Sequence, residues 1–169
     1  KAKQVKPTEI SEGCEIRLVP VGRTRTAMID PEYYKMVSQY VWRISPTGYA
    51  MSHSTGGTVY MHRLILGIPK GLETDHRNGN PLDNRKANLR FCTRAQNMAH
   101  KRIAKNNKSG YKGVTLVGRK TKKYLASICK DRKILRLGEF TTKEEAARKY
   151  DEWAKKLHGE FAWLNFPNE

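Results

Sequence analysis

Side chains able to carry out hydrolysis gather near the middle of the chain. Asp75 and His76 are adjacent, Asn88 follows a turn-rich loop, and Asn97 and His100 lie one turn apart on a predicted helix. Imidazole titrates near neutrality, so His76 is the natural base for activating water. Carboxylate and amide oxygens suit a hard cation such as Mg²⁺ or Mn²⁺. These residue types match what hydrolysis of a phosphodiester at one metal ion requires.

A strand, a loop, a second strand and a helix must position these groups. The first strand is predicted to end at residues 74–76, and Asn78-Gly79 then marks a turn. A second strand is predicted to begin at 89–92, and Thr93 is a good N-cap for a helix from Arg94 to about Ile103. An Asp-His pair alone is a weak signal, because a lone His is usually structural or merely exposed. The ordered run of turn, strand and helix is a strong one.

The residues on either side predict small sheets and short helices. Before the central run we expect strands at 15–20, 26–29, 41–45, 48–52 and 58–61, a helix over 31–40, and a short helix at 62–66 closed by Gly67. Residues 14–60 contain no motif that assigns a function; they extend the contact with the partner or act as a scaffold only. His53 and His62 are interpreted as structural.

A polar linker at 104–110 precedes a different pattern. Three strands are predicted at 111–117, 124–130 and 134–137, and Thr141 or Thr142 then caps a helix that runs to about His158. The apolar face of that helix predicts core packing against the sheet. The predicted class is α+β.

The charge of the chain predicts a polyphosphate partner. Lys and Arg number 33 against 16 Asp and Glu, a formal charge of +17 with a pI near 10.0. From residue 105 to 136 there are 11 Lys and Arg and one acid, Asp131, so the predicted strands carry most of the excess. Binding of Lys and Arg to a nucleic-acid backbone is favourable because it releases the counterions condensed on the phosphates. We find no long apolar run for a membrane. The three distant cysteines indicate neither a zinc knuckle nor a disulfide framework and favour an intracellular setting.

The central run resembles the HNH homing endonucleases of phages and introns, on residues 61–67, 75–85, 88–90 and 96–97. The resemblance implies a ββα-metal unit at about 72–103, with His76 as general base and Asp75 as a metal ligand. Asn88 would brace the loop by side-chain hydrogen bonds. Asn97 would be the second ligand; many relatives have His there, which implies a changed metal preference. His100 does not occupy the family's ligand position but could reach the ion directly or through water.

A second resemblance covers residues 109–114, 124–128, 137–151 and 159–167, which look like the APETALA/ethylene-response-factor DNA-binding domain. That family reads the major groove with its sheet and also occurs behind HNH modules in mobile endonucleases. Its groove-facing positions map onto Lys112, Thr115, Arg119, Lys123, Cys129 and Arg136. Arg119 and Arg136 are the better candidates for bidentate guanine contacts.

The sequence therefore predicts a two-part, Mg²⁺-dependent DNA endonuclease with Mn²⁺ as a substitute ion. The predicted nuclease domain covers 1–104 and a sheet-plus-helix DNA-binding domain covers 105–169. Double-stranded DNA is the expected partner, and a monomer that nicks is the simplest form. The residues expected to contact DNA are Lys112, Thr115, Arg119, Lys122, Lys123, Lys130, Arg132, Arg136, Arg77, Arg85, Arg90 and Arg94. Two alternatives remain open: a non-catalytic DNA-binding regulator that keeps the nuclease fold, and an RNA-binding protein.

Overall fold

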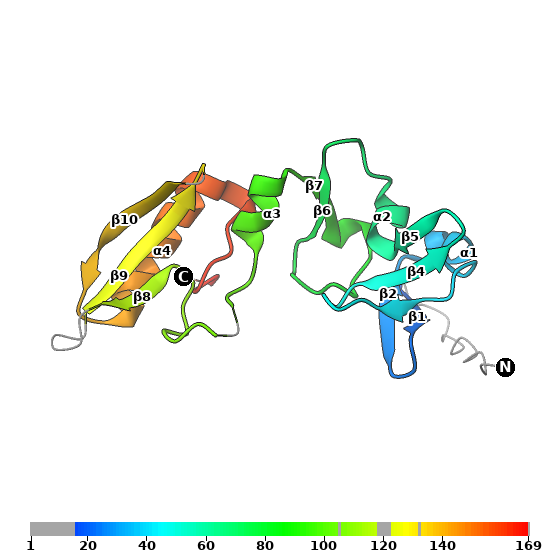
Figure 1. Ribbon diagram of the computed structural model, residues 1–169, viewed down its shortest axis with the longest axis horizontal. Helices are drawn as coiled ribbons and strands as arrows, with labels where there is room; N and C mark the ends of the chain where they lie inside the picture. The colour runs from blue at the N-terminus through cyan, green and yellow to red at the C-terminus, as the bar shows by residue number, and fades with distance from the viewer. Residues whose placement is uncertain (1–15, 105, 118–122, 132, 169) are drawn as a thin grey trace. The chain divides into compact units, whose positions relative to one another are not determined.

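The computed structural model describes residues 16–104, 106–117, 123–131 and 133–168 (Figure 1). The chain divides into two compact units, Lys1–Thr93 and Arg94–Glu169. Both are built from small antiparallel sheets and a few helices, so the α+β class predicted from the sequence is confirmed. None of the helices in the described part of the chain has the length and apolar character that crossing a bilayer needs.

The first unit begins with a two-stranded ribbon, β1 (Arg17–Val21) and β2 (Arg25–Ile29). Successive side chains of a strand point to opposite faces, so one face of this ribbon is buried. The buried residues are Val19, Val21, Ala27 and Ile29. They join the main hydrophobic core of the unit, together with Val37, Trp42, Met61 and Leu89.

A three-stranded sheet follows, made of β3 (Arg43–Ile44), β4 (Ala50–Ser54) and β5 (Gly57–Tyr60). The helix predicted over 31–40 is shorter in the structure: a 3-10 turn at Pro31–Tyr33 leads into α1 (Tyr34–Val37). It ends there because the indole Nε1 of Trp42 and the amide of Tyr40 both donate to the Val37 carbonyl, at 2.9 and 3.2 Å. The short helix α2 (Met61–Leu66) agrees with the prediction and ends at Gly67, whose φ is +64°.

The unit closes with a strand pair, β6 (Glu73–His76) and β7 (Leu89–Cys92), in antiparallel register. The loop between them contains a 3-10 turn, η2 (Lys86–Asn88). Gly79, with φ +66°, turns the chain after β6, and its amide donates to the His76 carbonyl at 2.8 Å. Both strands lie where the sequence predicted them.

The second unit begins with α3 (Arg94–His100) and then forms a three-stranded sheet of β8 (Val114–Val117), β9 (Lys123–Lys130) and β10 (Lys133–Phe140). The long helix α4 (Lys143–His158) covers one face of this sheet (Figure 1). Ala146, Ala147, Tyr150 and Ala154 of α4 are buried there along with Val114, Ala126 and Ile128. Thr142, one of the two predicted caps, makes a capping box with Glu145. Gly113, with φ +74°, leaves room for Tyr150, since a Cβ would overlap its ring.

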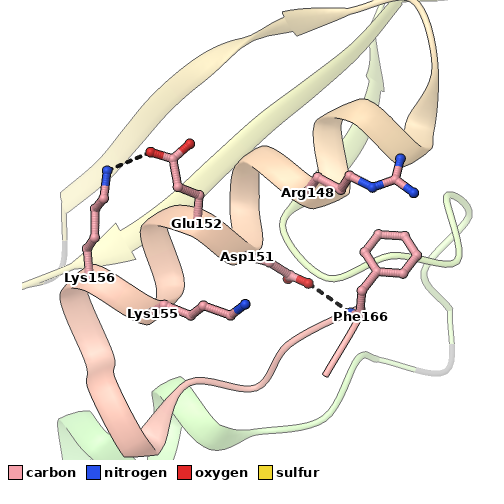
Figure 2. Close-up of a pocket in the computed structure, with 6 residues that line it drawn as sticks. All are labelled: Arg148, Asp151, Glu152, Lys155, Lys156 and Phe166. Atoms are coloured by element: carbon pink, nitrogen blue, oxygen red, sulfur yellow. Dashed lines mark hydrogen bonds and ion pairs between the residues drawn. The ribbon is translucent and has the colours of Figure 1, made fainter. Parts of the chain in front are cut away.

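The C-terminal segment returns to α4 through the buried carboxylate of Asp151 (Figure 2). The backbone amides of Asn165 and Phe166 donate to it at 2.9 and 2.8 Å, and the Asn165 side chain adds a bond at 3.0 Å. The cleft beside this anchor is lined by Arg148, Asp151, Glu152, Lys155, Lys156 and Phe166. Asp151 accepts hydrogen bonds from the C-terminal segment, and Glu152 accepts from Lys149 and Lys156. The cleft is therefore a structural feature of the C-terminal segment.

The sequence placed a domain boundary between residues 104 and 105, and that boundary stays a prediction. The compact division lies earlier, before α3. The ring of His100 packs edge-on against Trp163 with centroids 5.1 Å apart, and Lys112 Nζ donates to the carbonyls of Ala99 and, at 2.8 Å, Lys101. These contacts tie α3 to the sheet-and-helix unit.

Candidate active site

The strand pair β6–β7 brings the first group of predicted site residues together. Its register places Asp75 opposite Arg90 and His76 opposite Leu89. Asp75, His76 and Arg90 are all buried, with 6%, 4% and 7% of their surface exposed. Buried polar groups require partners, so the contacts of these side chains define the chemistry of the site.

His76 is held on several sides. Its Nε2 lies 3.3 Å from Oδ1 of Asn84, and the rings of His62 and Tyr49 lie 5.2 and 5.6 Å away between centroids. Burial lowers the pKa of His76 below its ordinary value, although Asn84 and the carboxylates of Asp75 and Asp83 pull it upward. The imidazole is therefore neutral at neutral pH, which is the form that accepts a proton.

A second buried histidine lies beside the first. Burial, reinforced by His76 and Arg63, lowers the pKa of His62 to about 3. Its ring also packs against Tyr49 and Tyr60, with centroids 5.0 and 5.6 Å away. The sequence interpretation of His62 as structural agrees with this packing. The positions of His62 and Tyr49 against His76 could not be predicted from the sequence, because both residues lie outside the strand-loop-strand run that carries His76.

Asp75 forms a buried ion pair with Arg90. The Nε and Nη2 atoms of Arg90 lie 2.8 and 2.7 Å from the same carboxylate oxygen, Oδ2. The sequence had grouped Arg90 with residues that contact DNA. The structure instead places its guanidinium inside the unit, because antiparallel pairing sets it directly across from Asp75.

Asparagine side chains organise the loop between the two strands. Asn88 Oδ1 accepts from the Asn78 amide at 3.0 Å, and Asn88 Nδ2 donates to the Asp83 carbonyl at 2.7 Å. Asn78 and Asn80 bond backbone amides two residues ahead, as loop-forming asparagines do. The Asn84 side chain differs from these two, because it is fully buried and reaches His76.

The predicted site residues on α3 belong to the second unit. Asn97 is half-buried on this helix, and His100 is buried against Trp163. The ring of His100 packs on Trp163 within its own unit, and a role for His100 at the metal ion stays a prediction. Convergence of Asn97 with Asp75 on one ion stays a prediction.

The donor chemistry fits a hard divalent cation. The two predicted ligands, a carboxylate and an amide, are oxygen donors, and Mg²⁺ commonly binds through one or two protein oxygens while keeping water and phosphate oxygens. In the described ranges of the chain, no three His, Cys, Asp or Glu side chains gather as metal ligands. A cation of this kind does not require such a set.

The residues predicted to contact DNA fall into three groups. Arg119, Lys122 and Arg132 lie outside the described residues. A second group, Lys112, Arg85 and Arg90, has internal partners. Lys112 donates to a carbonyl at the end of α3. The Nε and Nη2 atoms of Arg85 donate to the two carboxylate oxygens of buried Asp83, each at 2.7 Å. The exposed residues are Thr115, Lys123, Lys130, Arg136, Arg77 and Arg94.

The β8–β10 sheet has one face turned away from α4. Val114, Ala126 and Ile128 point toward the helix, so their neighbours along each strand point the other way. Thr115 pairs with Leu125, Ser127 with Arg136, and Cys129 with Ile134, which keeps these pairs on that second face. Four predicted groove positions, Thr115, Lys123, Cys129 and Arg136, therefore share it.

Comparison with known proteins identifies the family of the chain. A family model described as HNH endonuclease matches residues 59–99, from β5 to α3. A protein of Acanthamoeba polyphaga mimivirus named as an uncharacterized HNH endonuclease is 31% identical over 150 residues, which cover 85% of this chain and 76% of that protein. No solved structure matches. The chain belongs to the HNH endonuclease family, a family of nucleases that act on DNA. The APETALA/ethylene-response-factor resemblance gains no support from these matches and stays a prediction.

Proposed function

We propose that the chain is a metal-dependent DNA endonuclease of the homing type, with His76 as general base and one Mg²⁺ held by Asp75 and Asn97. Mn²⁺ would serve in its place. The observation that carries the proposal is a buried imidazole, held by Asn84, that directly follows a buried carboxylate on the strand pair of an HNH chain.

The chemistry assigned to His76 is proton removal from water. The water oxygen forms a bond to phosphorus, the bond from phosphorus to the leaving oxygen breaks, and the water proton passes to the imidazole. When bound, the cation supplies positive charge that stabilises the phosphate and the leaving oxygen. Asn88 acts at a distance: its bonds to Asn78 and Asp83 hold the loop that follows His76.

DNA targeting is assigned to the open face of the β8–β10 sheet, in the manner of an APETALA/ethylene-response-factor domain. Its exposed residues Lys123 and Arg136 supply positive charge, and a major groove admits strands as well as helices. Lys112 and Arg85 are left out of this surface because their charges already have internal partners. A monomer with one such site nicks a single strand.

One observation favours the alternative of a regulator that binds DNA without cutting it. Asp75 Oδ2 is already engaged by Arg90, and a carboxylate neutralised in this way can be purely structural. In that alternative the basic sheet binds DNA and the β6–β7 pair serves only as scaffold.

Incubation of the full chain with a random-sequence duplex library separates the two functions. An endonuclease is expected to produce new ends with Mg²⁺ or Mn²⁺ and none with EDTA, with the cut mapped on both strands. Equal binding in both conditions with no new ends would establish the regulator instead. Competition by structured RNA at fixed salt tests the RNA-binding alternative.

A further inference from the structure

Asn84 is distinguished from the other loop asparagines by where its side chain points. Asn84 is 0% exposed, and its Oδ1 lies 3.3 Å from Nε2 of His76. Its Nδ2 has no hydrogen-bond partner among the described residues. Buried polar side chains are normally hydrogen-bonded, and the contact with His76 is the one that satisfies the Asn84 side chain.

The backbone of Asn84 is fixed by a strand from another part of the unit. The Asn84 amide donates to the Met28 carbonyl at 2.8 Å, and the Met28 amide donates to the Leu82 carbonyl at 2.8 Å. Together these two bonds form an isolated parallel β-bridge between Met28 and Asp83. The β1–β2 ribbon, to which the sequence gave no function, thus holds the segment of the loop that touches His76.

A neutral imidazole has one donor nitrogen and one acceptor nitrogen, and an amide oxygen can only accept. A proton on Nε2 that bonds Asn84 Oδ1 leaves the lone pair on Nδ1. The opposite arrangement, with the amide NH₂ facing Nε2, would occupy the lone pair of His76 and leave no base. The rings of His62 and Tyr49 restrict rotation of the imidazole about this bond.

We propose that Asn84 is a positioning residue for the reaction: it accepts from His76 Nε2–H, fixes that tautomer, and presents Nδ1 as the atom that takes the proton from water. The β1–β2 ribbon is the scaffold that holds Asn84 in place. The effect of Asn84 on catalysis rests on the proposed function. The tautomer of His76 does not, because it is a property of the protein without substrate.

The tautomer is measured directly by two-bond ¹H–¹⁵N correlation spectra of the ¹⁵N-labelled, metal-free chain, at a pH where imidazoles are neutral. We expect His76 to carry its proton on Nε2 in the wild-type protein and in Asn84→Asp, which keeps an acceptor oxygen. In Asn84→Leu, similar in size but without an acceptor, we expect a mixture of tautomers. A His76 protonated on Nδ1 in the wild-type protein would overturn the inference.

Activity gives the second readout. In Asn84→Leu we expect kcat to fall by about 10–100-fold with KM unchanged, by analogy with the loss of a hydrogen bond that orients a metal-ligating histidine. A folded Asn84→Leu variant, verified by its amide spectrum, that retains wild-type kcat would overturn the positioning role. The spectra of the metal-free protein do not depend on cleavage, so failure of this inference and failure of the proposed function are distinguishable.

Discussion

The variant His76→Ala is expected to lose about 10²–10⁴-fold in the rate of DNA cleavage, the usual contribution of a positioned general base. The imidazole is buried and held by Asn84, so its replacement by a methyl group removes the proton acceptor from this position. His62 is a poor substitute, because burial lowers its pKa to about 3 and its ring packs against Tyr49 and Tyr60. The measurement is the single-turnover rate at saturating DNA and Mg²⁺, with DNA affinity measured in parallel.

The matched control for this variant is His53→Ala. His53 is an exposed histidine on β4 of the same unit, and its Nδ1 lies 3.3 Å from Thr58 Oγ1. We expect His53→Ala to cut at the wild-type rate. If His76→Ala binds DNA normally and cleaves as fast as His53→Ala, then His76 is not the base.

The variant Arg90→Met should lower the free energy of unfolding of the first unit by about 3–5 kcal/mol, the cost of leaving one member of a buried ion pair unpaired. Asp75 and Arg90 are both more than nine-tenths buried, and two guanidinium nitrogens lie within 2.8 Å of one carboxylate oxygen. The measurement is hydrogen exchange of the β6 and β7 amides across a denaturant series, which reports on this strand pair alone.

Two further variants assign the loss to the ion pair. Arg25→Met removes an exposed arginine from β2, and we expect a change within about 0.5 kcal/mol. Asp75→Leu combined with Arg90→Met removes both charges and should recover most of the stability, since apolar replacement of a buried pair is often neutral. Equal destabilisation by the single and double variants would show that packing, rather than charge, is what Arg90 provides.

The order of elements around the site could be predicted from the sequence because the signals are local. An Asn-Gly turn, a Thr residue just before α3 and the apolar residues of β7 are signals that depend on neighbouring residues only. The α4 cap and its apolar face are of the same kind. The helix at 31–40 was overestimated because its end is set by Trp42, a tertiary contact that periodicity does not reveal.

The partners of the polar side chains could not be predicted, because they depend on pairing across the fold. Nothing in composition or spacing separates Asn84, which contacts His76, from Asn78 and Asn80, which bond their own loop. Arg90 and Lys112 looked like two of many surface cations. The strand register pairs Arg90 with Asp75, and Lys112 donates a hydrogen bond to a backbone carbonyl at the end of α3.

The most direct measurement of the central claim is a Mn²⁺ titration of the isotope-labelled full chain bound to target DNA, made in the His76→Ala variant so that the DNA stays intact. A single ion held by Asp75 and Asn97 should broaden the signals of both residues at the same Mn²⁺ concentration, leave His53 sharp, and lose its effect in an added Asp75→Asn change. Broadening of one of the two without the other, or of neither, would contradict a shared metal site and with it the one-metal mechanism.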